Sequence, residues 1–173
     1  MKTIYGRKAI RYLPDNEVRA LIKWSSQPLL LEVMYFYGLR RAEVGLIKRT
    51  DVEADGIWIT ALKRRGNYRQ FMPFSDDLKN KIQVHLSSHD SAYLFPGYSG
   101  KGISGTGVAA IWKQVCPELS AHGIRHGRAM WFSDNGLPIE ECSWWLRHSS
   151  ISSTQVYYSI SATRAKKIAT QII

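Results

Sequence analysis

The segment from Pro28 to Tyr37 limits the possible folds of this chain more than any other. Its residues are nearly all apolar, and proline is favoured in the first turn of a helix because its fixed φ suits the helix and its missing N–H has no partner there. A helix that is apolar on almost every side is stable only when neighbours cover it. The sequence therefore predicts a helix over Pro28–Tyr37 inside the hydrophobic core.

This apolar segment is not predicted to cross a membrane. The longest apolar run, Leu29 to Leu39, contains Glu32 and is shorter than the ~20 apolar residues that a bilayer requires. The N-terminal residues contain no apolar stretch of the kind that a secretory signal needs. The two cysteines, Cys116 and Cys142, form no CxxC pair and are predicted to be free, buried thiols. We therefore expect a soluble protein in a reducing compartment, the cytoplasm.

Apolar spacing predicts further helices on both sides of one pair of strands. The predicted helices begin at Pro14–Glu17, near Arg40 and at Ser75 or Asp76, and continue with Val108–Val115, Leu119–Asn135, Pro138–Leu146, Ser152–Tyr158 and Ala162–Ile172. Two β-rich segments, Ile57–Thr60 and Arg69–Met72, are separated by a turn and are predicted to pair antiparallel. The predicted fold class is mainly α with a small antiparallel β-sheet (α+β).

The chain is expected to form one domain. Its 173 residues are enough for one sizeable core and too few for two independent ones. No internal repeat, low-complexity tract or linker interrupts it. We therefore expect a single domain over residues 1–173, with residues 1–13 as a lead-in and residues 161–173 as a C-terminal tail helix.

The charge of the chain indicates a polyanionic partner. Lysine and arginine number 24 and aspartate and glutamate number 14, which gives a formal net charge of +10. An excess of this size is typical of proteins that bind nucleic acid or an anionic membrane surface. Because no segment suits a membrane, nucleic acid is the expected partner.

Three separate segments carry a high density of cationic and nucleophilic side chains. The first, Tyr37–Val44, is a tight turn that opens a helix, with Arg40 at the N-terminus, where backbone amides favour an anion. The second is His122-Gly-Ile-Arg125-His, in which helical spacing puts His122 and Arg125 on one face. The third runs from Leu146-Arg-His148 to Tyr157-Tyr158.

In their order and spacing, these segments resemble the three sequence boxes of the tyrosine recombinases, the family of the phage integrases. Gly-Leu-Arg-x-x-Glu, which contains Arg40, resembles the first arginine box. His-x-x-Arg-His resembles the central box, and Leu-x-His with a tyrosine nine residues later resembles the closing box. The resemblance extends from about Leu13 to Ser161 and implies a DNA breaking-rejoining catalytic domain.

The resemblance implies a covalent mechanism that uses neither metal nor ATP. The chain would be a site-specific DNA recombinase whose nucleophile, Tyr157, forms a 3′-phosphotyrosine link with the cleaved strand. Arg40 and Arg125 suit this chemistry because guanidinium groups stay charged and bind phosphate oxygens bidentately. His122 is the expected acceptor of the phenol proton, and His148 is expected to bind a phosphate oxygen. No cofactor or metal ligand is predicted.

A lysine on the β-hairpin is implied as the proton donor for the leaving 5′ oxygen. The hairpin sequence has one lysine, Lys63, while counting back from Pro73 leads to Arg65. We favour Lys63, since arginine is a poor general acid, and Arg65 remains the alternative. The expected DNA-contacting cations are Arg64, Arg65, Arg69 and Arg147. Arg147 occupies a position at which the family usually has glycine.

The same side chains have simpler explanations when they are taken one at a time. Arg40 would then be a surface cation paired with Glu43, and Tyr157 and Tyr158 would be packing aromatics. The joint pattern favours the catalytic interpretation. Four other aromatic residues are predicted to be core: Trp131, Phe132, Trp144 and Trp145.

The family resemblance also implies partners that the residues alone do not. It implies binding to double-stranded DNA in dimers or tetramers that pass through a four-way junction, with the tail docked on a neighbouring protomer. An N-terminal DNA-clamping domain, usual in the family, is expected to be absent, so the chain is either a fragment or a natural single-domain form. Two alternatives stay open: a topoisomerase of the same chemical type, and a catalytically silent DNA-binding regulator.

Overall fold

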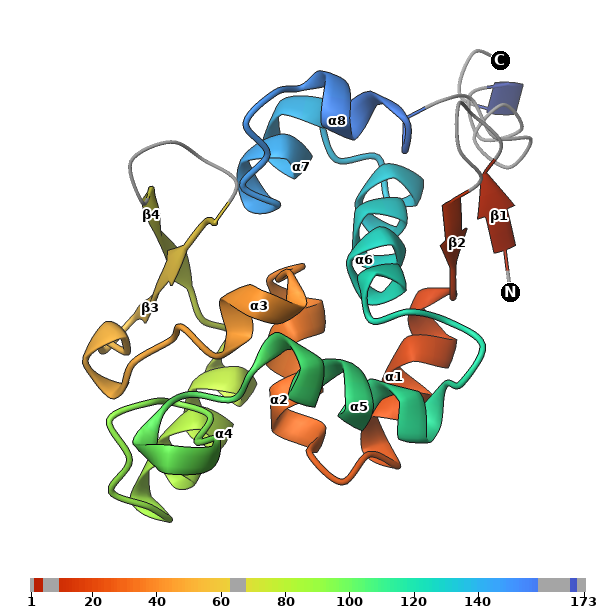
Figure 1. The fold of residues 1–173 in the computed structure, drawn as a ribbon. Coiled ribbons are helices and arrows are strands. Elements are labelled where there is room, and N and C mark those ends of the chain that lie inside the picture. Colours follow the sequence, from red (N-terminus) through yellow and green to blue (C-terminus); the bar gives the residue numbers. More distant parts are fainter. Residues whose placement is uncertain (1, 5–9, 63–67, 159–168, 171–173) are drawn as a thin grey trace.

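The computed structural model describes residues 2–4, 10–62, 68–158 and 169–170 of the chain (Figure 1). Along the sequence, its elements are β1 Lys2–Ile4, β2 Ile10–Tyr12, α1 Asp15–Lys23, α2 Pro28–Phe36, α3 Arg41–Val44, η1 Arg49–Asp51, β3 Gly56–Thr60, β4 Arg69–Pro73, α4 Asp76–Ser87, η2 Tyr98–Gly100, α5 Gly105–Val115, α6 His122–Asp134, α7 Ile139–Trp145 and α8 Ser152–Gln155. This arrangement confirms the predicted mainly helical fold with a small antiparallel sheet.

The predicted core helix is α2. It contacts α1, α3, α4 and α6, and these neighbours cover it on several sides. Its buried residues are Leu30, Leu31, Val33, Met34 and Tyr35. Burial of this many large apolar side chains, at about 1.5–3 kcal/mol each, makes α2 the centre on which the other helices pack.

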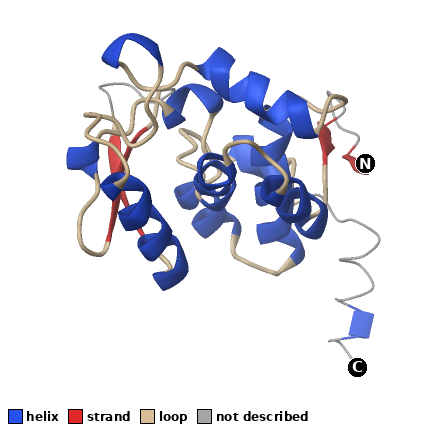
Figure 2. Ribbon diagram, turned by 90° about the horizontal axis from the view of Figure 1, so that it is seen from below, coloured by secondary structure: helices blue, strands red, loops and turns tan. Residues whose placement is uncertain are grey.

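Each end of the helical body carries one short antiparallel hairpin (Figure 2). The hairpin of β3 and β4 is the predicted one, with Ile57 opposite Met72 and Ile59 opposite Gln70. Alternate residues of both strands are buried, as expected of a sheet with one covered face. The other hairpin, β1 with β2, lies in the segment that the sequence suggested was only a lead-in. Its strand β2 packs against α6.

A second, smaller hydrophobic cluster lies between β2, α6, α7 and the segment after α8. Its buried members are Tyr12, Ala129, Met130, Phe132, Cys142, Leu146 and Tyr157. The predicted nucleophile, Tyr157, is therefore part of a packed region. Both cysteines are free and buried, as predicted.

Three details of the sequence prediction need correction or lie outside the structure. Trp144 is about half exposed, since its neighbour Trp145 takes the inward side of α7. The helix predicted over Ser152–Tyr158 ends at Gln155. Of the predicted tail helix, only residues 169–170 are described, and they are helical. Within the described residues, no helix is long and apolar enough to cross a membrane.

The helix that follows Arg40 is only one turn long, because another part of the chain crosses the end of it. Gly45 ends α3, and a Cβ atom added there would lie 1.8 Å from the carbonyl oxygen of Ile103. A Cβ atom added at Gly102 would lie 1.9 Å from the carbonyl oxygen of Gly45. Two backbones therefore touch at this point, which only glycine permits. The contact fixes α3 against the segment that leads into α5.

The substitution Gly45→Ala is expected to lower the free energy of unfolding by about 3 kcal/mol or more, because a backbone carbonyl has to move. Gly136→Ala is the matched control. Gly136 has φ +79° but no atom within 4 Å of the added Cβ, so only about 1 kcal/mol of backbone strain is expected. Urea unfolding of both variants measures the difference, and equal losses would contradict the backbone contact.

Candidate active site

The first arginine box is a turn at the C-terminal end of α2. Gly38 has φ +58°, and a Cβ there would lie 2.4 Å from Cδ2 of Leu146. The turn leads to Arg40, whose backbone N–H and guanidinium both donate to the carboxylate of Glu43, at 2.9 Å and 2.7 Å. Glu43 is buried and Arg40 is largely so. The pair of Arg40 with Glu43 is therefore an interior contact, and not the surface pair that was considered from the sequence.

Arg125, on α6, connects the first and third boxes. Its guanidinium is buried and donates to the carbonyl oxygens of Gly38 and Leu146, each at 2.5 Å. Burial, followed by the charges of Arg40 and Arg147, lowers the pKa of Arg125. The two arginines predicted to bind phosphate are therefore electrostatic neighbours, although 85 residues of sequence separate Arg40 from Arg125.

His148 follows α7 and is buried beside these cations. Its Nδ1 lies 2.7 Å from Oγ1 of Thr154 in α8. Burial and the nearby charges, Arg125 first and then Arg40, lower the pKa of His148 to about 3. The imidazole is therefore neutral at pH 7 and offers one N–H group for hydrogen bonding.

The phenol of Tyr157 is buried and makes a hydrogen bond with a histidine. Its oxygen lies 2.6 Å from Nδ1 of His126, on α6. Burial raises the pKa of Tyr157 to about 12, against the opposing effect of Arg125 and Arg40. Burial also lowers the pKa of His126 to about 3, so both partners are neutral at pH 7.

The histidine next to the phenol is not the one that the motif suggested. His122 is exposed, and its ring lies 4.4 Å from the ring of His126, at nearly a right angle. His126 was missed as a site residue, although it is the last residue of the His-x-x-Arg-His box and lies one helical turn after His122. Its contact with Tyr157 depends on where the chain returns after α8, which no local pattern reveals.

The structure thus brings Arg40, Arg125, His148 and Tyr157 into one region. The charges of Arg40 and Arg125 act on the pKa values of both His148 and Tyr157. These four residues come from the turn after α2, from α6 and from the segments on either side of α8. Among the described residues, no hydrogen bond joins the phenol to either arginine. Tyr157 therefore lies near the two guanidinium groups without contacting them directly.

The model of the "Phage integrase family" matches residues 11–164. The chain belongs to this family. The tyrosine recombinase XerC of Corynebacterium glutamicum is 30% identical over 145 residues, which is 78% of this chain and 47% of XerC. XerA of Pyrococcus furiosus is 24% identical over 170 residues, or 93% of this chain and 57% of XerA. The chain spans about half the length of these relatives.

Solved structures of the family have the same fold as this chain. The crystal structure of XerA recombinase superposes with a TM-score of 0.76 at 21% identity, covering 93% of this chain and 64% of that one. The crystal structure of XerH site-specific recombinase bound to difH substrate superposes with a TM-score of 0.69 at 17% identity, covering 91% of this chain and 52% of that one.

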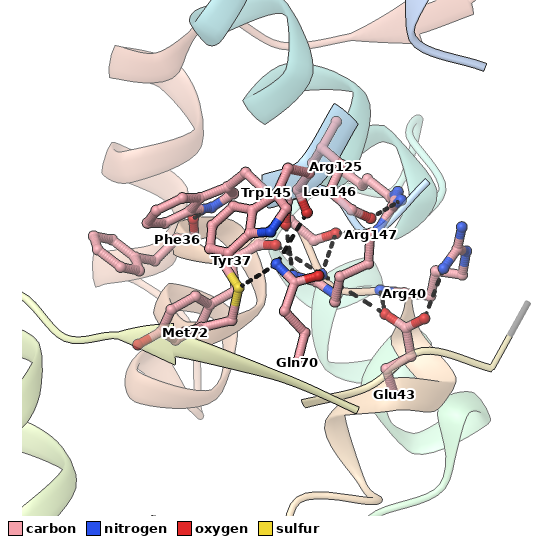
Figure 3. A network of polar contacts seen from close by, with 12 residues as sticks. Phe36, Tyr37, Arg40, Glu43, Gln70, Met72, Arg125, Trp145, Leu146 and Arg147 are labelled. Atoms are coloured by element: carbon pink, nitrogen blue, oxygen red, sulfur yellow. Dashed lines mark hydrogen bonds and ion pairs between the residues drawn. The ribbon is translucent and has the colours of Figure 1, made fainter. Parts of the chain in front are cut away.

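In this integrase-family chain, Arg147 does not face the surface, as a DNA contact was expected to do. Its side chain is fully buried. Its guanidinium donates to the carbonyl oxygens of Trp145 at 2.7 Å and Tyr37 at 2.8 Å (Figure 3). The residue has φ +55° and ends α7 in a Schellman motif, with N–H bonds from Arg147 to Trp144 and from His148 to Ser143. That backbone conformation turns the side chain inward.

The β-hairpin of this integrase-family chain is described only at its base. Lys63, Arg64 and Arg65 lie outside the described residues, so the choice between Lys63 and Arg65 stays a prediction. Arg69, on β4, pairs with Asp51 and has its guanidinium 5.5 Å from the centre of the Trp58 ring. It is still about half exposed.

Gln70, the residue after Arg69, connects the hairpin to α7. Its buried Nε2 donates to the carbonyl oxygen of Trp144 at 3.1 Å. This hydrogen bond holds the β3–β4 hairpin against the C-terminal end of α7, next to the third sequence box. In the part of the chain that the structure describes, no three His, Cys, Asp or Glu side chains gather as a metal site would require.

Two histidines, the buried His148 and the partly buried His126, make the fold sensitive to acid. A histidine whose pKa is about 3 when folded and about 6.5 when unfolded stabilises the fold above pH 6.5, and that stability is lost as the pH falls towards 3. His126 and His148 should each account for about 2 kcal/mol of the free energy of unfolding lost between neutral pH and pH 5. Urea unfolding at both pH values measures this loss.

The variant His126→Asn should lose about 2 kcal/mol less than the parent chain over the same pH interval, because Asn does not titrate. Tyr157→Phe is the control, since it removes the phenol but leaves the buried imidazole and its acid sensitivity. An unchanged loss in the Asn variant would show that burial does not lower the pKa of His126 as the structure indicates.

Proposed function

We propose that this chain is the catalytic domain of a site-specific DNA recombinase that cleaves and rejoins DNA strands through Tyr157. The observation that carries the proposal is the convergence of Arg40, Arg125 and His148 on the region beside this buried phenol. Membership of a family whose named relatives are tyrosine recombinases supports the same activity.

The arginines suit the charge that develops during the reaction. When the Tyr157 oxygen attacks phosphorus, a P–O bond to tyrosine forms and the bond to the 5′ oxygen breaks, with extra negative charge on the non-bridging oxygens in between. Arg40 and Arg125 are the proposed donors to those oxygens, and preorganised donors of this kind are worth about 3–4 kcal/mol each. His148, neutral, would donate a further hydrogen bond. The phosphotyrosyl bond keeps the energy needed for rejoining.

Proton transfer has to accompany the attack. Burial raises the pKa of Tyr157 to about 12 and lowers that of His126 to about 3, so transfer of the phenol proton to His126 is unfavourable in the DNA-free state. The phenol therefore stays protonated until a phosphate is bound. His122 remains the proposed acceptor, and Lys63, or alternatively Arg65, the proposed donor to the leaving 5′ oxygen.

We also propose double-stranded DNA as the partner, with dimers or tetramers forming on two sites and passing through a four-way junction. A related structure is a dimer of lambda integrase bound to a COC' core site, and another is the Tn1549 transposon integrase in complex with transposon DNA. The net charge of +10 supports a DNA partner. The cytoplasm or nucleoid is the proposed location, because the proposed substrate is DNA, and a phage or mobile element is the proposed setting.

The proposal is tested by trapping the covalent intermediate. The chain is incubated with a pool of nicked duplexes that share a randomised core, and protein-bound DNA that survives denaturant is sequenced. A captured sequence then serves as the suicide substrate. A chain that relaxes supercoiled DNA without sequence preference would instead be a topoisomerase, and one that binds without forming an adduct would be a silent regulator.

Tyr157→Phe is expected to abolish the adduct, because the attacking oxygen is gone. Tyr158→Phe is the matched control and should form it at close to the parent rate. The hydroxyl of Tyr158 donates to the carbonyl of Leu137 at 2.9 Å and serves packing. Denaturing gel electrophoresis of labelled DNA measures both, and an adduct in the Tyr157→Phe variant would exclude Tyr157 as the nucleophile.

A further inference from the structure

Arg147 is a third guanidinium beside the two that are proposed to bind phosphate, and it does not face the surface. It follows α7 with a positive φ, a conformation that glycine usually occupies at this place in a helix end. Its side chain is fully buried. Both the positive φ and the burial of a charge are unfavourable for arginine. The contacts of the guanidinium therefore have to offset these costs.

Those contacts are carbonyl groups at the ends of two helices. Besides Trp145 at the end of α7, the guanidinium reaches the oxygens of Tyr37 at 2.8 Å and Gly38 at 3.5 Å, where α2 ends. The last carbonyls of a helix lack partners within it and carry the negative end of its dipole. Arg147 therefore holds the third box against the turn that leads to Arg40.

The same guanidinium is also the second cation beside Glu43. Its Nη2 lies 3.9 Å from Oε2 of Glu43, and Oε1 of the same carboxylate accepts from Arg40 at 2.7 Å (Figure 3). A buried carboxylate with a single cationic partner would bind that partner strongly, since nothing else would offset its charge. With Arg147 also present, Glu43 keeps a counter-charge when Arg40 moves.

We propose that Arg147 is a positioning residue that acts as the internal counter-ion of Glu43 and so leaves Arg40 available to bind a phosphate oxygen. The inference rests on the proposed strand-transfer function. It gives the buried arginine a role different from DNA contact. The cluster of Arg40, Arg125 and Arg147 around one carboxylate keeps an excess of positive charge, which an incoming phosphate would offset.

The test compares Arg147→Met with the control Arg19→Ala, which removes one positive charge from an exposed pair on α1. At saturating captured DNA, Arg147→Met should lower the rate of adduct formation at least tenfold and change DNA affinity less than twofold. Arg147→Lys should recover part of the rate, because it keeps the charge. Arg19→Ala should change the rate less than twofold. A parent-like rate in Arg147→Met would overturn the inference.

A double-mutant cycle tests the link to Glu43 itself. If Arg147 acts through this carboxylate, the two substitutions are not independent. The rate of adduct formation by the double variant Glu43→Gln with Arg147→Met should then be at least fivefold higher than the rate obtained by multiplying the relative rates of the two single variants. Independent effects would overturn the inference. Arg147→Gly covers the possibility that methionine disturbs folding, because glycine adopts a positive φ without strain. A folded Arg147→Gly variant with parent-like rate would also refute the role.

Failure of the proposed function is separable from failure of this inference. The urea midpoints of the same four proteins, parent, two single variants and the double variant, need no DNA. If the parent forms no adduct, strand transfer is wrong, but non-additive midpoints would still support the link between Arg147 and Glu43. If the parent forms the adduct and both rates and midpoints are additive, only the inference about Arg147 is wrong.

Discussion

The C-terminal end of α2 is the point on which the site depends. Three successive carbonyl groups there accept from side chains that come much later in the sequence. Phe36 accepts from the indole N–H of Trp145, Tyr37 from Arg147, and Gly38 from Arg125. A helix leaves its last carbonyls without partners. Because α6 and α7 provide those partners, the three sequence boxes meet at one place.

This arrangement keeps several guanidinium groups inside a small domain through three kinds of partner: backbone carbonyls, a carboxylate and aromatic rings. Near the proposed site, Arg125 and Arg147 lie against backbone carbonyls and Arg40 against Glu43. Farther along α6, the guanidinium carbon of Arg128 lies 4.4 Å from the ring centre of Trp131 and 4.6 Å from that of Phe132. Carbonyl dipoles and ring faces both offset part of the desolvation of a buried cation. The result is a region near the proposed site in which Arg40, Arg125 and Arg147 outnumber the one carboxylate, Glu43.

Local patterns in the sequence were enough for most of the fold. The apolar segment at Pro28 predicted the core helix, and the β-rich segments Ile57–Thr60 and Arg69–Met72 predicted the hairpin. Long-range contacts caused the errors. Trp144 turns outward because Trp145 occupies the inward position. The hairpin of β1 and β2 carries no strong strand signal, and its strand β2 packs against α6.

The sequence by itself determined which chemical groups this protein has and the family to which it belongs, because motif spacing and charge are properties of the chain. The tertiary structure decided which groups meet. It put His126, and not His122, against the phenol of Tyr157, and it turned Arg147 inward. The physical reason is that burial and partner choice depend on elements that are distant along the chain. Those elements set which pKa values shift and which cationic side chains are left to bind a phosphate.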